Sequence, residues 1–297
     1  MSRAGDQGGG GRQPRVVALG GGHGLAATLR SVRTFTDHVT AVVSVADDGG
    51  SSGRLRELMD ILPPGDLRKC LVALAEPGSL LASAFAHRFR EGELSGHSLG
   101  NLVLARLMDA AGDPIRGLDE AARLLGVQGR VLPATTELVV LKAEVEGGSI
   151  SGQVAVMGND RIRRVSLVPG DTPAPGPVID AIRSAELIVL GPGSLFTSVL
   201  AAIAVPGIAE AIRESGGRTV YVGNLRPQVP ETAGFDLGMH ITALVAHGVD
   251  ADVAVYDPSG LALGDPGIPI IEASLCRPNG LAHDPAKLAK VLSNLVG

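Results

Sequence analysis

The chain has 297 residues, of which 45% are hydrophobic, 19% are charged and 41 are glycine, with a formal net charge of −5. This composition is typical of a compact protein with many tight turns and excludes the disordered and fibrous classes. With no basic surface expected, and with two Tyr, five Phe and no Trp, nucleic acid is not an expected partner.

The cysteines and the N-terminal segment indicate the cellular compartment. Cys70 and Cys276 are too few for a disulfide framework or a four-cysteine zinc site, so both are expected to be buried thiols in a reducing environment. Residues 1–13 contain a glycine run and no apolar stretch, so we expect a disordered tail there and a single domain over 14–297. No segment approaches the roughly 20 apolar residues of a membrane span. The sequence therefore predicts a cytoplasmic protein without a membrane partner.

Strands and helices alternate along the chain. A strand over 16–19 enters a glycine-rich loop and then a helix, and a strand over 39–45 enters an acidic, glycine-rich loop over 47–53 and a second helix. Downstream, the sequence predicts a strand over 187–190 with a third glycine-rich loop, strands over 219–222 and 253–256, and a helix over 241–247. Segment 66–111 is typical of consecutive helices, and segment 137–168 of strands with a turn near 147–148.

This alternation predicts an α/β fold in which one mostly parallel sheet is covered on both faces. Segments 66–111 and 137–168 are then insertions that pack against that sheet. In such folds ligands bind beyond the carboxyl ends of the strands, and all three glycine-rich loops lie at such ends.

The loop after the first strand is a candidate anion site. Its glycines allow tight turns, and amides at the start of the next helix can bind a phosphate. The spacing matches neither the dinucleotide fingerprint nor the P-loop, so a tight turn without ligand is the alternative. The candidate ligand-binding residues are Gly20, Gly21, Gly22, His23, Gly24 and Leu25.

The second loop begins with two adjacent carboxylates, which repel each other unless a cation, a ribose hydroxyl or amides compensate. The position is suited to a ribose contact or to Mg²⁺ that bridges phosphate oxygens. The alternative is that Asp48 or Ser52 caps the following helix. The candidates here are Asp47, Asp48, Ser51, Ser52 and Arg54, with Asp47 and Asp48 as the Mg²⁺ ligands.

Two helix starts add further candidates. Asp66 is expected at an N-cap, and Arg68 follows in the first turn, where a cation gains nothing from the helix dipole and therefore indicates an anion partner. His97 and Asn101 are four residues apart and share a helix face, although capping by Ser98 is an alternative explanation of that segment. No nucleophile stands beside His97 in the sequence, so nothing there favours a hydrolase.

The loop after the third strand repeats the anion-binding pattern with Gly191, Pro192, Gly193 and Ser194, followed by Thr197. A diphosphate can be held between this loop and the first one. Polar residues after the next predicted strand are candidates for reading a base or sugar: Asn224, Gln228, Glu231 and Thr232.

In combination these blocks resemble the YvcK, or gluconeogenesis factor, family. The resemblance is carried in chain order by segments 20–25, 45–56, 62–66, 96–102, 190–194 with 197–198, and 231–235, and it covers nearly the whole chain. His23 stands where many members have threonine, and Ala282 where many carry arginine.

The resemblance implies a Rossmann-like three-layer α/β/α fold, with 14–297 as one CofD-like domain, shared with 2-phospho-L-lactate transferases of coenzyme F420 synthesis. It also implies binding of uridine-diphosphate sugars such as UDP-N-acetylglucosamine and a role in cell shape and growth on gluconeogenic carbon sources, without a settled enzymatic activity.

Two functions follow. The first is a regulatory protein that binds a nucleotide-sugar. The second is a transferase that moves a phospholactyl-type group from a nucleotide donor to a deazaflavin, in which a carboxylate among Asp47, Asp48 and Asp66 acts with Mg²⁺. The sequence blocks favour the first, and they leave open a homo-oligomer and a regulatory protein partner.

Overall fold

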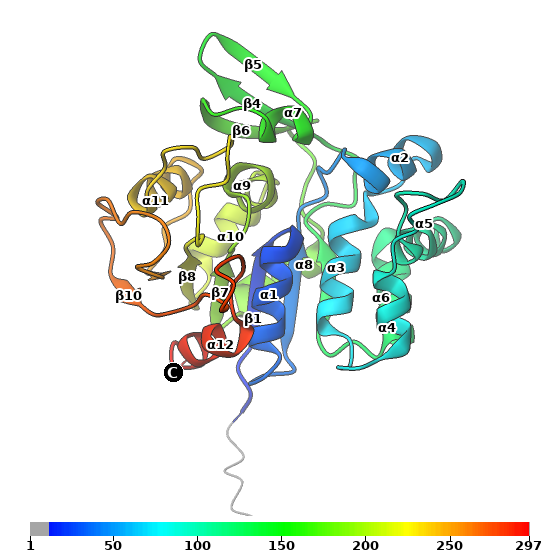
Figure 1. Ribbon diagram of the computed structural model, residues 1–297, viewed down its shortest axis with the longest axis horizontal. Helices are drawn as coiled ribbons and strands as arrows, with labels where there is room; N and C mark the ends of the chain where they lie inside the picture. Colours follow the sequence, from blue (N-terminus) through cyan, green and yellow to red (C-terminus); the bar gives the residue numbers. More distant parts are fainter. Residues whose placement is uncertain (1–11, 297) are drawn as a thin grey trace, which may run out of the picture.

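A seven-stranded parallel sheet forms the centre of the computed structural model, which describes residues 12–296 (Figure 1). Its strand order is β10-β9-β8-β7-β1-β2-β3. The strands are β1 (Val16–Gly20), β2 (Val39–Val43), β3 (Arg130–Pro133), β7 (Leu187–Leu190), β8 (Arg218–Val222), β9 (Val253–Tyr256) and β10 (Ile270–Glu272). The chain moves outward from β1 to β2 and β3, then returns to the other side of β1 for β7.

The five predicted strands are confirmed, and the two edge strands were missed. Every residue of β1 and β7 is buried, so both are continuous apolar runs, which a strand covered on both faces requires. In contrast, β10 has three residues that are exposed or half-buried, and β3 ends in a proline. Edge strands of this kind carry a weak sequence pattern.

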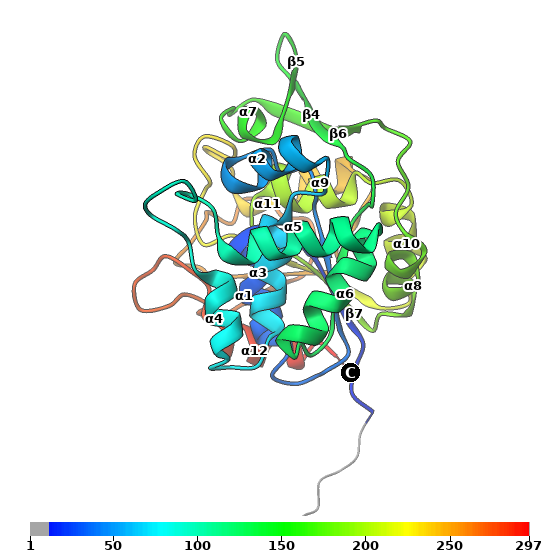
Figure 2. The same ribbon diagram turned by 90° about the vertical axis from the view of Figure 1, so that its right-hand side faces the viewer.

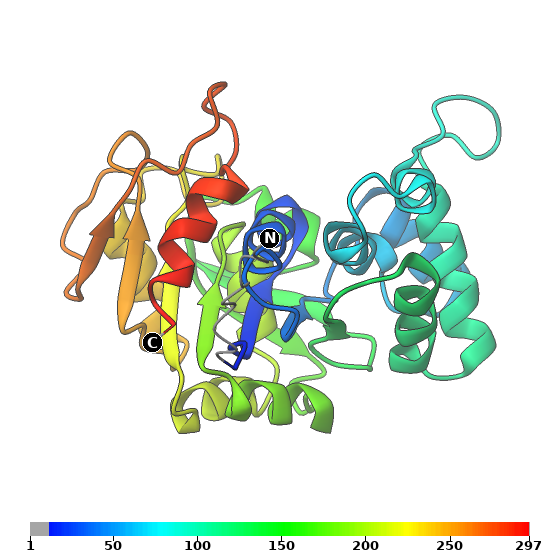
Figure 3. The same ribbon diagram turned by 90° about the horizontal axis from the view of Figure 1, so that it is seen from below.

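Helices cover both faces of the large sheet. In Figure 3, α1 (Gly22–Val32) and α12 (Pro285–Ser293) lie on one face, and α8 (Gly176–Ser184) and α10 (Ile208–Glu214) lie on the other. The three-layer α/β/α prediction is confirmed. The other helices of this body are η1 (Leu195–Val199), α9 (Leu200–Ile203) and α11 (Leu237–Ala246).

The first insertion is a group of helices beside the β3 edge, and it faces the viewer in Figure 2. It consists of α2 (Gly50–Met59), α3 (Pro64–Leu74), α4 (Leu80–Ala86), α5 (Leu99–Ala111) and α6 (Pro114–Leu125). Residues 87–98 between α4 and α5 form an irregular loop, so the predicted run of helices is interrupted there.

The second insertion is a separate three-stranded antiparallel sheet of order β5-β4-β6. It contains β4 (Val140–Val145), β5 (Gly148–Ser151), α7 (Gln153–Met157) and β6 (Ile162–Val168), with the turn at the predicted position. This sheet lies above the carboxyl ends of the large sheet (Figure 1) and contacts η1 and α9. Buried residues of both insertions belong to the same hydrophobic cluster as the large sheet.

Three helices begin earlier than the sequence predicted. α1 begins at Gly22 and α2 at Gly50, so parts of both predicted loops are helical, and α11 begins at Leu237. Small residues in these first turns allow close packing, since a Cβ on Gly53 would lie 2.1 Å from the Asp48 carbonyl oxygen. Glycine therefore marked the start of a helix as well as a turn.

Most of the predicted N-terminal tail, residues 1–11, lies outside the described residues. Its last two residues contact the domain: Arg12 pairs with Glu186 at 3.5 Å, and the Gln13 Oε1 accepts a hydrogen bond from the Asp37 amide at 2.8 Å. Cys70 is buried as expected, whereas Cys276 is half-buried.

No single helix within residues 12–296 has the length and apolarity to cross a membrane. One bent pair, Leu195–Ile203 with Ile208–Glu214, meets those criteria jointly. Every residue of its first segment is buried in the protein core.

Candidate functional site

Two glycine loops meet where the strand order reverses: the loop after β1 (20–25), here the first glycine loop, and the loop after β7 (191–194), here the second glycine loop. They follow the adjacent strands β1 and β7, and such a switch point is the usual ligand site of an open parallel sheet. Gly20, Gly22 and Gly193 have φ of 147°, 66° and 144°, which other residues rarely adopt. A Cβ on Gly24 would lie 2.1 Å from the Pro192 carbonyl oxygen. Glycine at this position is therefore what allows the two loops to touch.

A cavity of about 250 Å³ opens beside these loops. It is lined by His23, Gly24, Pro192, Gly193, Asn224 and Gln228 from the predicted set, and by Ala27, Leu225, Arg226, Pro227, Leu281, Ala282 and His283. Arg226 was missed, although it lies between two predicted polar residues in a loop after a strand. Leu25, by contrast, is fully buried in the core. The cavity thus unites the first loop, the second loop and the segment after β8.

Protein side chains already bind several of the loop amides. The Gly22 amide donates to the Asp66 carboxylate at 2.7 Å, and the Gly193 amide donates to the Asn224 Oδ1 at 2.9 Å. The Asn224 amide nitrogen in turn donates to the Gly193 carbonyl at 2.9 Å. Asp66 lies inside the first turn of α3 and not at its N-cap, which is Pro63. A ligand phosphate would therefore have to replace Asp66 at the Gly22 amide.

Glu231 occupies the helix start behind the second glycine loop. Its carboxylate accepts bonds from the Phe196 amide at 2.8 Å, the Thr197 amide at 3.1 Å and the Thr197 hydroxyl at 2.9 Å. The side chain is buried, and this burial raises the pKa of Glu231 despite the three donors. Thr232 closes the same loop, because its hydroxyl accepts the Gln228 amide at 2.9 Å. Thr197, Glu231 and Thr232 hence shape the site from behind it.

The adjacent carboxylates Asp47 and Asp48 point to different partners. Both Asp48 oxygens accept amides from the start of α7, from Gln153 at 2.9 Å and Val154 at 3.0 Å. Asp48 therefore caps a helix of the second insertion. It does not cap α2, whose N-cap is Gly49, and Ser52 instead accepts the Gly65 amide at 3.1 Å.

Asp47 faces Asp66 across Gly65. A Cβ on Gly65 would lie 3.5 Å from the Asp47 Oδ2, and the Asp47 Oδ1 accepts the Gly49 amide at 3.0 Å. Burial, and then the nearby Asp66 carboxylate, raise the pKa of Asp47. Lys69, which the sequence analysis did not select, pairs with Asp66 at 2.8 Å and supplies the local positive charge.

The fit of this region to Mg²⁺ depends on Asp47. No group of three or more His, Cys, Asp or Glu side chains converges anywhere in residues 12–296. Asp48 binds the amides of α7, and Asp66 binds Gly22 and Lys69, which leaves Asp47, beside the Ser52 hydroxyl, as the remaining carboxylate. One carboxylate can hold Mg²⁺ together with ligand phosphates, as many nucleotide sites do.

The other predicted residues form a buried network between α2, α3 and α5. The Asn101 amide donates to the Ser51 hydroxyl at 3.0 Å, and the same hydroxyl forms a hydrogen bond with the His97 Nδ1, also at 3.0 Å. Arg68 donates its Nε–H to the Asn101 Oδ1 at 2.8 Å. Arg54 lies at the edge of this group. Folding thus places a serine beside His97 that sequence adjacency could not show.

Asp66 and Arg68 lie on opposite faces of α3. Two residues correspond to a rotation of about 200° around an α-helix. Asp66 accordingly contacts α1 at Gly22, whereas Arg68 contacts Asn101 of α5. The predicted residues therefore divide into a glycine-loop cavity, a set of capping side chains and a separate network around Arg68.

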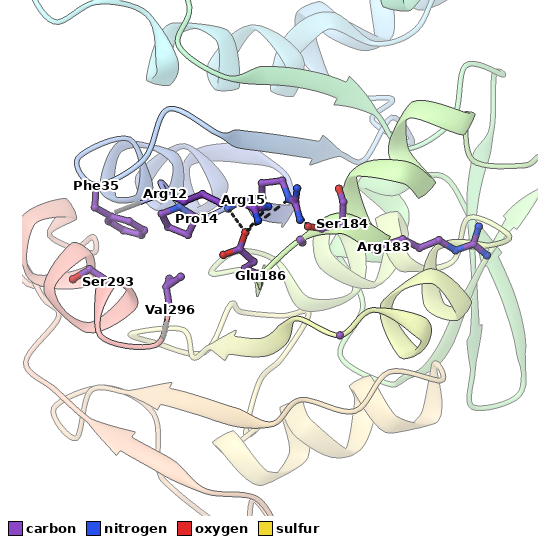
Figure 4. Close-up of a pocket in the computed structure, with 11 residues that line it drawn as sticks. Arg12, Pro14, Arg15, Phe35, Arg183, Ser184, Glu186, Ser293 and Val296 are labelled. Carbon is purple, nitrogen blue, oxygen red and sulfur yellow. Dashed lines mark hydrogen bonds and ion pairs between the residues drawn. The ribbon is translucent and has the colours of Figure 1, made fainter. Parts of the chain in front are cut away.

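A cavity of about 620 Å³ lies at the other end of the sheet, near the N-terminal ends of β1 and β7 (Figure 4). Arg12 and Arg15 both lie near Glu186 in its wall, and Arg183 pairs outward with Glu214. Because ligands of parallel sheets bind at the carboxyl ends, the switch-point cavity remains the candidate site.

Comparison with known proteins places this chain among close relatives. The family model described as 2-phospho-L-lactate transferase CofD matches residues 16–262. A protein named gluconeogenesis factor from Halalkalibacterium halodurans is 47% identical, over 82% of this chain and 78% of the relative. The gluconeogenesis factor of Bacillus subtilis is 43% identical, over 80% of this chain and 76% of the relative.

Solved structures agree with the sequence comparison. A crystal structure of a UPF0052-family protein from Bacillus halodurans is 39% identical, with a TM-score of 0.91. The match covers 96% of this chain and 100% of that chain.

Proposed function

This chain belongs to the CofD family, with the gluconeogenesis factors as relatives, and we propose that it is a cytoplasmic regulatory protein that binds a nucleotide-sugar such as UDP-N-acetylglucosamine. The role we propose is control of cell shape during growth on gluconeogenic carbon. The observation that carries the binding proposal is the switch-point cavity, where a buried carboxamide oxygen of Gln228 has no partner within the described residues.

Gln228 is suited to reading a pyrimidine base. Its Oε1 is an acceptor and its amide nitrogen a donor, which complements the N3–H and a carbonyl of uracil. A buried acceptor without a partner is costly, so a ligand that donates to it gains affinity. Ala282 also lines the cavity and offers no charge to the ligand.

The diphosphate fits beside Arg226 and the first glycine loop. Arg226 is exposed and takes part in no ion pair of the described residues. Desolvation, and then the Lys69 ammonium, lower the pKa of His23, so its neutral imidazole can donate to phosphate. When phosphate takes the Gly22 amide from Asp66, Lys69 remains as the partner of the displaced carboxylate.

Calorimetry with UDP-N-acetylglucosamine tests this proposal. We expect Gln228→Leu and Arg226→Ala each to weaken binding at least about tenfold, equivalent to about 1.4 kcal/mol. Arg116→Ala, an exposed change on α6, is the control and should bind as the wild type does. Absence of binding to the wild type, or equal affinities in all four proteins, would reject the cavity as a nucleotide-sugar site.

A transferase is the second candidate, and the raised pKa of Asp47 beside Asp66 favours it. A carboxylate of this kind can accept a proton from an attacking hydroxyl, and Mg²⁺ would stabilise the charge on the phosphates. Against it, no Phe, Tyr or Trp lines the switch-point cavity, so a deazaflavin ring could stack there only on the smaller imidazoles of His23 and His283.

The two candidates differ in one measurable product. Incubated with Mg²⁺, a deazaflavin alcohol and a lactyl or enolpyruvyl diphospho-guanosine donor, the protein should release no guanosine monophosphate. Turnover on the order of 1 per second, lost in Asp47→Ala, would establish the transferase instead.

A further inference from the structure

Arg68 is a buried cation whose anion is missing from the described residues. Only 6% of Arg68 is exposed, and no carboxylate of residues 12–296 lies within ion-pair distance of it. Its Nε–H binds the Asn101 Oδ1 at 2.8 Å, and one terminal nitrogen reaches the Phe85 carbonyl at 3.4 Å. Buried charges are ordinarily paired because desolvation is costly.

Two further arginines, Arg54 on α2 and Arg88 in the 87–98 loop, donate to carbonyl groups of that loop. Arg54 donates to the Ser95 carbonyl at 3.2 Å, and Arg88 donates to the Gly96 carbonyl. Neither guanidinium forms an ion pair with any residue in 12–296. Burial, followed by these two arginines, lowers the pKa of His97, which favours the neutral imidazole. Guanidinium groups that lie near one another without a carboxylate partner indicate a binding site for an oxyanion ligand.

Ser98 supplies a second, independent sign of a missing ligand. It is fully buried, and its hydroxyl has no hydrogen-bond partner in the described structure. Ser98 is the N-cap of the 13-residue α5, yet its side chain accepts no helix amide, so the predicted capping role is wrong. It also pairs with Arg88 across an isolated β-bridge.

The first turn of α5 is shaped to lie against Arg68. A Cβ on Gly100 would be 2.7 Å from the Arg68 Cδ and 2.6 Å from the Phe85 carbonyl oxygen. Glycine here brings the guanidinium close to a helix N-terminus, where the dipole also favours an anion.

We propose that Arg68, Arg88, Ser98 and the start of α5 form a binding site for an oxyanion, the phosphate or carboxylate of a small molecule. This site is distinct from the glycine-loop cavity, because Arg68 and Asp66 lie on opposite faces of α3. The 87–98 loop projects from the insertion in Figure 2, and its two ends carry Arg88 and Ser98. The proposal does not depend on nucleotide-sugar binding.

Thermal unfolding during titration with inorganic phosphate, at ionic strength held constant with chloride, tests the site. We expect the wild-type Tm to rise at millimolar phosphate, and the apparent affinity to fall at least tenfold in Arg88→Ala and in Ser98→Ala. Arg106→Ala is the matched control, since Arg106 is an exposed α5 arginine paired with Asp109, and it should respond as the wild type does.

Two further arms make the result decisive. Acetate replaces phosphate in a parallel titration, and the tighter ligand identifies which oxyanion the site prefers. Arg226→Ala, in the glycine-loop cavity, should retain the response. The proposal is overturned if neither anion stabilises the wild type, if all variants respond equally, or if Arg226→Ala alone loses the response. Because neither Arg88→Ala nor Ser98→Ala removes Arg68, the test keeps the buried guanidinium in place.

Discussion

The two glycine loops look alike in sequence, but different carboxylates fill them. At the first loop, Asp66 binds the Gly22 amide, its side chain is 15% exposed, and Lys69 neutralises it at 2.8 Å. At the second loop, Glu231 is 1% exposed, binds three donors around Thr197, and has no cation within ion-pair distance in the described structure.

The difference shows which loop can exchange its carboxylate for a ligand. Asp66 can leave the Gly22 amide without becoming an unpaired charge, because Lys69 goes on neutralising it. If a ligand displaced the Glu231 carboxylate, that carboxylate would lose all three of its hydrogen bonds and would have no cation to pair with. The three buried donors would also be left unpaired unless the ligand bound them. We therefore propose that the first loop is the exchangeable anion site and that the second is a structural support.

Loss of the Glu231 carboxylate should have the largest effect. Glu231→Ala leaves the Phe196 and Thr197 amides unsatisfied in the core, and we expect a loss of about 3–5 kcal/mol in the free energy of unfolding. Urea denaturation measures it. Glu210→Ala, on an exposed position of α10, is the control and should change stability by less than about 0.5 kcal/mol. A loss under about 1 kcal/mol in Glu231→Ala would show that the second loop does not need its carboxylate.

Separation of the loops should cost less. Gly24→Ala places a Cβ 2.1 Å from the Pro192 carbonyl oxygen, so the two loops must move apart, with an expected loss of about 1–3 kcal/mol. Affinity for UDP-N-acetylglucosamine should fall in parallel. In Gly216→Ala the new Cβ meets no atom within 4 Å, so this control should be near neutral. Unchanged stability and binding in Gly24→Ala would mean that the loops need not touch.

The first loop should tolerate loss of its carboxylate. Asp66→Ala removes one partly exposed bond and one ion pair, so we expect a loss of about 1 kcal/mol in unfolding free energy. Without Mg²⁺, affinity for UDP-N-acetylglucosamine should rise several-fold because the Gly22 amide becomes free. Asp109→Ala breaks an equivalent i,i+3 pair on α5 and controls for general charge removal. Weaker binding in Asp66→Ala would show that Asp66 contacts the ligand directly.

The smallest effect concerns pH and Asp47. Its folded-state pKa lies above the ordinary 3.8, so between those two values the folded protein holds a proton that the unfolded chain releases. Stability therefore falls as pH rises through this window. Asp47→Asn, which cannot ionise, should gain stability relative to the wild type as the pH rises through the same range.

Urea unfolding at a series of pH values from acidic to neutral checks the sign. Asp250→Asn changes an exposed aspartate on the surface and serves as the control. A pH profile of Asp47→Asn parallel to that of the wild type would remove Asp47 from the carboxylate pair.

Local pattern was sufficient for much of the fold. The apolar runs of β1 and β7 and the glycines after them predicted buried parallel strands with loops at their carboxyl ends, and the family blocks predicted the three-layer architecture. Arg226 was within reach of the same reasoning, since it stands between Asn224 and Gln228 in a loop already selected. Helix starts at Gly22 and Gly50 were misplaced because glycine signals a turn and a helix start alike.

The roles of the charged residues could not be read from local pattern. The residues around Asp48 in the sequence predict a ligand contact or an N-cap for α2. In the structure Asp48 caps α7, which lies more than 100 residues later in the chain. Ser51 and His97, separated by 46 residues, meet only because α2 packs against α5 and the residues just before it. His97 itself precedes the Ser98 N-cap, so the prediction that it shares a helix face with Asn101 is wrong.

The sequence by itself determined the five inner strands of the large sheet, the glycine loops and the family, because buried strands are continuous apolar runs and tight turns require glycine. The tertiary structure decided which carboxylate fills which loop and which arginine remains without an acid. Asp66 reaches Gly22 across 44 residues, and Glu231 reaches Thr197 across 34. Such pairings depend on which elements pack against each other in the folded protein. The residues next to a side chain in the sequence therefore do not predict its partner.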